Sequence, residues 1–225
     1  MPTINDFAQM ASGAYDATPS VSGWHAGPPV YDSNSGLRSV IYSNGDVVVV
    51  AFRGTDNASD LVEDAELTMG MNTAMYPIGE AVASGAGSSG PVYVTGHSLG
   101  GAVAQVVGKR MELPFVTFNA PGVALLASRN IGSAYPLATL ARLQGAVNSA
   151  LRRPGQAISD IRSTFNSVNG KNYRLSTDIV SATGVHYGDI VTLPAGTVNP
   201  ATAHGIATMI GVLSGSATGA ITFPR

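Results

Sequence analysis

A serine at position 98 stands between two glycines in the segment Gly96-His97-Ser98-Leu99-Gly100. A serine becomes a strong nucleophile when a sharp turn exposes its hydroxyl and a histidine removes its proton. Glycines two positions before and after the serine leave room for such a turn, because larger side chains would collide there. Glycine makes up 27 of the 225 residues, so this elbow-like pattern alone is weak support for a nucleophile.

The residues around Ser98 predict the turn that a nucleophile needs. Val92 to Thr95 is a β-rich apolar run, and Leu99 to Met111 has apolar residues at helical spacing. Ser98 therefore falls between a strand and a helix, where the Leu99 amide would face the oxygen of a reacting carbonyl. The alternative interpretation is a glycine-rich loop in which Ser98 caps the helix.

Strands and helices alternate along the rest of the chain. Leu37 to Tyr42 and Asp46 to Phe52 are joined through an Asn-Gly pair, which is typical of a tight turn, so we expect an antiparallel hairpin near the N-terminus. Later β-rich runs cover 115–118, 173–175 and 189–193, whereas the small residues of 83–90 predict a loop. This alternation indicates an α/β fold, with a central, mostly parallel sheet and helices on both faces.

Two further motifs stand at predicted strand ends, one on each side of the serine. They are Phe52-Arg53-Gly54-Thr55 upstream and Phe118-Asn119-Ala120-Pro121-Gly122 downstream. Together with Gly96 to Gly101 they resemble the class 3 lipase family, over residues 38–205. The resemblance implies the α/β-hydrolase fold and an ester hydrolase similar to fungal lipases and bacterial phospholipases. It also implies an oxyanion hole in which Thr55 adds a second donor to the Leu99 amide.

The resemblance further implies that the acid and then the histidine follow the serine along the chain. Among the later aspartates only Asp178 lies just beyond a predicted strand, and it matches the family's Asp-x-Val segment. His204 follows the last predicted strand, where this fold has its base, whereas His186 precedes that strand. We therefore predict Ser98, Asp178 and His204 as catalytic residues, with His186 as an alternative base or a pocket residue.

Charge is distributed unevenly along the chain. Residues 56–66 hold five acidic residues and no basic one, and the stretch 56–70 lies where class 3 lipases carry a lid over the serine. Residues 129–174 hold seven basic residues and one acid. We interpret 129–171 as a basic helical insertion whose apolar stripe packs on the core, as in an ordinary surface helix. A basic amphipathic helix that faces anionic lipid is the alternative there, and a fixed surface loop is the alternative to a lid over 56–70.

Composition excludes several classes of protein. The chain has no cysteine, so disulfides, thiol catalysis and cysteine-bound zinc are excluded. A net charge of −2 gives no general attraction to nucleic acid, and no metal or organic cofactor is implied. The length and the hydrophobic share of 44% predict one folded domain over residues 1–225.

No stretch has the pattern of a signal peptide or of a membrane span. Residues 1–11 lack a basic start and a continuous apolar run. Residues 205–223 carry no charge, but their large apolar side chains follow the spacing of a helix with one buried face. We therefore expect a protein that stays in the cytoplasm or leaves the cell by a non-classical, specialised route.

Taken with the resemblance, the sequence predicts a serine hydrolase that cleaves carboxylic esters of lipids through an acyl-enzyme. The substrate would be a triacylglycerol or a phospholipid cut at an acyl position, met at a membrane or micelle surface. The basic segment slightly favours phospholipid. A short-chain esterase or acyltransferase, and a bacterial phospholipase toxin delivered by a specialised secretion system, are alternatives. A binding protein that keeps the fold without catalysis is a further alternative, and no protein partner is predicted.

Overall fold

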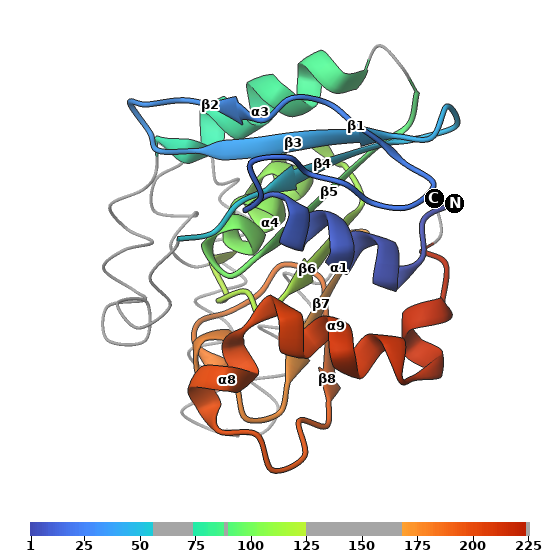
Figure 1. Ribbon diagram of the computed structural model, residues 1–225. Coiled ribbons are helices and arrows are strands. Elements are labelled where there is room, and N and C mark those ends of the chain that lie inside the picture. Colours follow the sequence, from blue (N-terminus) through green and yellow to red (C-terminus); the bar gives the residue numbers. More distant parts are fainter. Residues whose placement is uncertain (56–73, 88–89, 125–167, 224–225) are drawn as a thin grey trace.

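The computed structural model describes residues 1–55, 74–87, 90–124 and 168–223. In these ranges an eight-stranded sheet forms the centre of the molecule, and helices cover both faces (Figure 1). The strands are β1 (His25–Ala26), β2 (Val30–Tyr31), β3 (Arg38–Ser43), β4 (Val48–Phe52), β5 (Val92–His97), β6 (Phe115–Phe118), β7 (Gly170–Leu175) and β8 (Asp189–Leu193). The helices and helical turns are α1 (Ile4–Gly13), α3 (Met75–Ala86), α4 (Leu99–Met111), η2 (Val180–Ala182), α8 (Pro200–His204), α9 (Ile206–Ser214) and η3 (Ala217–Ala220).

Most strands of the sheet are parallel. Their spatial order is β1-β3-β4-β5-β6-β7-β8, and β2 also pairs with β3. The first three strands and β4 meet in antiparallel pairs, whereas β4 to β8 all run in one direction. The predicted α/β fold, with a mostly parallel sheet and an N-terminal antiparallel hairpin, is therefore confirmed.

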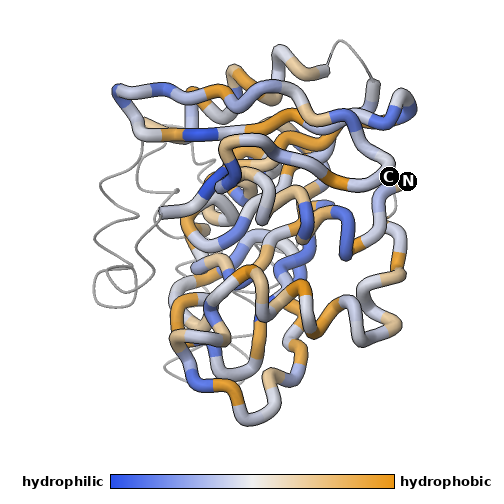
Figure 2. Tube along the Cα trace, in the orientation of Figure 1, coloured by the Kyte–Doolittle hydropathy of each residue, from blue (hydrophilic) through white to orange (hydrophobic). Residues whose placement is uncertain are grey.

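Each face of the sheet packs against its own pair of helices. Helices α3 and α4 cover one face, and α1 and α9 cover the other (Figure 1). On the central strand β4, Val48, Val50 and Phe52 point into the first layer, while Val49 and Ala51 point into the second. Strand β4 is therefore covered on both faces, as is typical of a strand with an unbroken apolar run. Apolar residues accordingly follow the inner strands, and strongly hydrophilic ones gather at outer turns (Figure 2).

Two local details differ from the predictions. The β3–β4 connection pairs Ser43 with Val48, so the loop has four residues, 44–47, rather than the predicted three, 43–45. The Asn44 side chain accepts hydrogen bonds from the Asp46 and Val47 amides, both at 3.1 Å, which stabilises the longer loop. The predicted loop over 83–90 was wrong for its first residues, because α3 continues to Ala86.

Small residues explain why α3 extends into that stretch. Ala83 and Ala86 are buried in the core layer between α3, α4 and the sheet. Farther back, a methyl group on Gly79 would lie 3.0 Å from Val107 and 3.2 Å from Val103 of α4. The small side chains therefore let two helices approach closely, a packing advantage that offsets their weak helix preference.

Several predictions concern segments outside the described residues. The lid candidate 56–70 and residues 129–167 of the basic insertion lie there. The end of the predicted insertion was wrong, because Gly170 and Lys171 belong to β7, where Lys171 forms an ion pair with Asp189 at 3.0 Å. Among the helices that the structure describes, none has both the length and the apolar character needed to cross a bilayer.

The parallel strands bring the predicted site residues to one edge of the sheet. Thr55 follows β4, Ser98 follows β5 and Asp178 follows β7, each at the carboxyl end of its strand. The carboxyl ends of neighbouring parallel strands meet at the same edge, which is where α/β proteins bind ligands. His204 reaches this edge at the end of α8.

Candidate active site

Ser98 lies on a sharp turn between β5 and α4. The strand continues two residues past the predicted Thr95, to His97, and α4 begins directly after the serine. Ser98 has φ 57° and ψ −128°, a backbone conformation that costs a non-glycine residue about 1–3 kcal/mol. Its amide donates to the Phe118 carbonyl oxygen at 3.1 Å, which fixes the turn against β6.

The two glycines of the motif allow backbones to touch. A methyl group on Gly96 would overlap the Gly100 carbonyl and come within 2.7 Å of the Gly101 nitrogen. A methyl group on Gly100 would overlap the carbonyl oxygen of Phe52, at the end of β4. Both positions therefore exclude every side chain, which is the steric reason predicted from the sequence.

The other two motifs pack directly on this turn. The position of a Cβ on Gly54 lies 3.2 Å from the Ser98 Cβ, so the segment that ends β4 borders the serine. On the other side, a Cβ on Gly101 would lie 2.5 Å from the Ala120 Cβ. The three motifs on which the resemblance rests are therefore one contiguous structure around Ser98.

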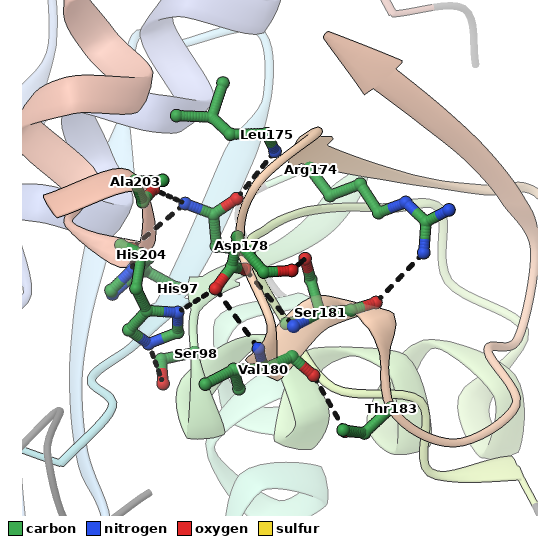
Figure 3. Close-up of polar contacts among 12 residues, drawn as sticks. His97, Ser98, Arg174, Leu175, Asp178, Val180, Ser181, Thr183, Ala203 and His204 are labelled. Carbon is green, nitrogen blue, oxygen red and sulfur yellow. Dashed lines mark hydrogen bonds and ion pairs between the residues drawn. The ribbon is translucent and has the colours of Figure 1, made fainter. Parts of the chain in front are cut away.

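Ser98, His204 and Asp178 form a line of hydrogen bonds (Figure 3). The Ser98 Oγ lies 2.9 Å from His204 Nε2, and His204 Nδ1 lies 2.9 Å from Asp178 Oδ1. Because a carboxylate accepts, Nδ1 carries the proton and Nε2 faces the serine hydroxyl as an acceptor. All three side chains are at most 3% exposed. The arrangement can deprotonate the serine hydroxyl and orient the imidazole as it does so.

Backbone amides hold the Asp178 carboxylate in place. Asp178 follows β7 and precedes the helical turn η2, whose first residues fold back over it. The Val180 amide donates to Oδ1 and the Ser181 amide to Oδ2, both at 3.2 Å (Figure 3). Both carboxylate oxygens therefore have donors, which fixes the side chain in the orientation that meets His204.

His204 is the last residue of the short helix α8 rather than a loop residue. The helix starts with Pro200 after Asn199, whose side chain accepts from the Thr202 amide at 2.9 Å. This cap and the proline favour a helix start at that point. The base thus stands on a helical turn just after the last strand, consistent with its predicted position along the chain.

Asn119 is a site residue that the sequence analysis did not single out. Its side chain is fully buried and donates to the carbonyl oxygens of Ala203 and His204, at 2.8 and 3.0 Å. Its Oδ1 accepts from the Leu175 amide at 3.0 Å, at the end of β7. Asn119 therefore joins the segment that carries the acid to the one that carries the base. Its φ of 46° is a left-handed backbone conformation, which asparagine adopts more readily than most residues. The asparagine at this place in the motif after β6 is therefore the sequence signal that could have indicated it.

His186, the alternative base, is directed elsewhere. Its Nε2 lies 2.9 Å from the carbonyl oxygen of Ala120, and the side chain is buried. The hydrogen bonds to Ser98 and Asp178 are both made by His204. The geometry thus brings together the three residues predicted for the triad and assigns His186 a contact within the loop after β6.

The two predicted oxyanion donors flank the serine. Leu99 opens α4, so its amide has no partner within the helix. Thr55 lies next to Gly54, which borders Ser98, and its hydroxyl is buried without a hydrogen bond among the described residues. Leu99 directly follows Ser98, and Thr55 directly follows the glycine that borders it.

His97 is buried beside His204. Burial, and then the neighbouring His204, lower the pKa of His97 from 6.5 to about 4. The imidazole is therefore neutral in the folded protein at ordinary pH.

We expect the free energy of unfolding to fall as the pH drops from about 6.5 to about 4, because of His97. In that range the unfolded chain takes up a proton on His97 that the folded chain does not bind. A shift from 6.5 to about 4 corresponds to at most about 3 kcal/mol. Urea unfolding of the wild type and His97→Gln at about pH 7 and pH 4.5 measures it. An equal loss in both proteins would contradict the prediction.

Comparison with known proteins identifies the family. A model of the phospholipase-like Tle-like phospholipase domain matches residues 8–218. The chain belongs to this family. The extracellular phospholipase A1 of Serratia liquefaciens is 31% identical to this Tle-like chain over 105 residues, which are 46% of the chain and 33% of that protein. The chain thus spans a third or less of the length of the curated relatives it matches.

Solved structures share the fold of this Tle-like domain. MDLA of Penicillium cyclopium matches with a TM-score of 0.53 and 17% identity, over 89% of this chain and 83% of that one. A Rhizomucor miehei lipase in complex with its propeptide matches with a TM-score of 0.52 and 12% identity, over 85% and 66%. The Tle-like chain therefore has the α/β-hydrolase fold of fungal lipases, and family and fold together point to a lipid ester hydrolase.

Proposed function

We propose that this chain hydrolyses acyl ester bonds of phospholipids, with Ser98 as the nucleophile. The observation that carries the proposal is the buried hydrogen-bonded line from Ser98 through His204 to Asp178. This line has the acceptor and donor order that a serine hydrolase requires. The family to which the chain belongs supports a lipid ester as the substrate class.

In the first half of the reaction, Ser98 becomes acylated. His204 Nε2 takes the hydroxyl proton as Oγ attacks the acyl carbon, and Asp178 stabilises the resulting imidazolium. The ester C–O bond then breaks, and His204 passes the proton to the departing alcohol oxygen. The alcohol leaves as a lysophospholipid, and the acyl group stays on Ser98.

In the second half, water regenerates the serine. His204 takes a proton from the water as its oxygen attacks the acyl carbon, and then returns a proton to Ser98 Oγ as the fatty acid leaves. The negative oxygen formed in both halves is bound by the Leu99 and Thr55 amides and by the Thr55 hydroxyl. A single donor of this kind accelerates such reactions by about 10²–10³-fold.

The choice of phospholipid over triacylglycerol rests on two supports. The family model describes a phospholipase-like domain, and a relative of this chain is named extracellular phospholipase A1. The seven basic residues between 129 and 174 are suited to an anionic headgroup surface. The fungal lipase structures support the fold alone and do not distinguish phospholipid from triacylglycerol as the substrate.

A substrate panel tests the proposal directly. The purified chain is incubated with diacyl phospholipids, triacylglycerols and short soluble esters, and released fatty acid and lysophospholipid are measured. We expect fatty acid and lysophospholipid from the phospholipids, loss of both with Ser98→Ala, and covalent labelling of Ser98 by a fluorophosphonate probe. An unlabelled wild-type protein would contradict the serine mechanism, and release from triacylglycerols alone would contradict the phospholipid assignment.

A further inference from the structure

We infer that Tyr15 and His97 are a positioning pair that holds the two sides of the active site in register. One side carries Thr55 and the other carries His204. The inference rests on the proposed function, because it assigns both residues a role in the same reaction. Tyr15 follows α1 and His97 ends β5, so their contact joins segments that lie 82 residues apart in the chain.

The pair belongs to one continuous line of hydrogen bonds. The Gly54 amide donates to the Tyr15 hydroxyl oxygen at 3.1 Å, and that hydroxyl lies 3.0 Å from His97 Nδ1. On the other side of the ring, His97 Nε2 lies 2.7 Å from the carbonyl oxygen of His204. The line therefore begins at the residue before Thr55 and ends on the backbone of the proposed base.

The chemistry of the partners fixes the position of each proton. A carbonyl oxygen only accepts, so His97 Nε2 donates to His204. In a neutral imidazole Nδ1 is then an acceptor, and the Tyr15 hydroxyl donates its single proton to it. A lone pair of the same hydroxyl receives the Gly54 amide. All three bonds are thus satisfied together in a single state, the neutral Nε2–H form of His97.

A neutral His97 suits the reaction that takes place beside it. The His97 and His204 ring centroids are 5.0 Å apart. In the proposed mechanism His204 becomes a cation, and a second buried cation at this distance would oppose that step. Burial already keeps the pKa of His97 at about 4. His97 can therefore hold the backbone of His204 without acquiring a charge that competes with it.

The two ends of the line act on the transition state more than on substrate binding. Gly54 precedes Thr55, and a loosened Gly54 amide lets the oxyanion donor drift from the acyl oxygen. A loosened His204 backbone lets Nε2 drift from Ser98 Oγ. A displacement of up to about 1 Å at a reacting centre reduces the rate by about 10- to 100-fold. The effect falls on kcat, because the groups concerned interact most strongly with the transition state.

Four variants test the pair. Tyr15→Phe removes the hydroxyl. His97→Gln replaces the ring by a shorter amide, whose nitrogen can still donate to His204 but whose oxygen does not reach the place of Nδ1 at the same time. We expect each variant to lower kcat about tenfold at unchanged KM. The double variant should be no worse than either, because both changes break the same hydrogen bond, the one between the Tyr15 hydroxyl and His97 Nδ1. His97→Ala breaks both links, so we expect about a 100-fold loss that glutamine partly restores. The kcat is counted per serine labelled by a fluorophosphonate probe, so misfolded protein is excluded.

Tyr93→Phe is the matched control. Tyr93 is a fully buried tyrosine of the layer under α1, whereas Tyr15 is half-buried, and the Tyr93 hydroxyl makes no hydrogen bond among the described residues. Removing that hydroxyl leaves both ends of the line intact, so kcat stays at the wild-type value. Thermal unfolding of every variant checks that differences in kcat do not arise from differences in stability.

The possible results separate the inference from the proposed function. If the wild type cleaves phospholipid and Tyr15→Phe and His97→Gln keep its kcat, the positioning pair is overturned while the proposed function stands. If the double variant loses the product of the two single effects, Tyr15 and His97 act independently and the pair is again overturned. A wild-type protein that neither cleaves nor is labelled overturns the proposed function, and the inference fails with it.

Discussion

Replacing His204 with alanine is expected to lower kcat by about a millionfold, which is close to the effect of Ser98→Ala. His204 Nε2 is the acceptor 2.9 Å from the Ser98 hydroxyl, and without it the serine has no base. The two losses should not add, because the residues act as one unit. Measurement of kcat with a phospholipid substrate, for both single variants and for the double variant, tests the expectation.

His186→Gln is the control for this experiment. His186 is also a buried histidine that follows Ser98 in the chain, but its Nε2 contacts the Ala120 carbonyl oxygen. Glutamine retains an amide that can meet this carbonyl, so we expect the variant to keep most of the wild-type kcat. If His204→Ala stays active and His186→Gln does not, the assignment of the base is reversed.

The sequence was sufficient to predict the part of the site that is local. Ser98, its two glycines and the strand and helix around it lie within about twenty consecutive residues, and their chemistry depends on short-range geometry. The structure brings these elements together as expected, with the strand extended to His97. Asp178 and His204 are 26 residues apart and their pairing is long-range, so it could be predicted only from the order of serine, acid and histidine along the chain that the resemblance implied.

Asn119, Tyr15 and His97 show where sequence reasoning ends. Asn119 was recognised as part of a motif, but the three hydrogen bonds of its side chain reach segments 56 to 85 residues away. Tyr15 lies in an N-terminal stretch with no motif at all, and its partner His97 was predicted only as a residue of the turn. Their roles arise from tertiary contacts between buried polar groups, which composition and periodicity do not encode.

These buried polar contacts have a common physical purpose. The strand ends that carry the site are joined by backbone contact at the glycines and by side-chain bonds to backbone groups elsewhere. A buried side chain bonded to two segments fixes their separation, because breaking either bond leaves an unsatisfied group at a cost of about 1–3 kcal/mol. The hydroxyl, imidazole and carboxylate of the site are thereby held in position by neighbours that need not react.

Asp178→Asn is expected to lower kcat by about 10⁴-fold, although the side chains have nearly the same shape. Oδ1 of Asp178 meets His204 Nδ1, and Oδ2 meets the Ser181 amide. An asparagine whose nitrogen faces His204 forces Nδ1 to accept, so the ring proton moves to Nε2 and points at Ser98. In the opposite orientation an oxygen still meets His204. In either orientation, however, the new nitrogen faces a backbone donor, the Val180 amide at the Oδ1 place or the Ser181 amide at the Oδ2 place.

Asp189→Asn provides the matched control for this change of one atom. Asp189 lies on β8, its side chain is 56% exposed, and it pairs with Lys171 at 3.0 Å. Such surface pairs contribute at most about 1 kcal/mol, so this variant should keep both its fold and its kcat. Comparison of kcat per mole of folded protein between the two variants isolates the role of Asp178. A loss of less than about tenfold in Asp178→Asn would show that the His204 tautomer is set by another group.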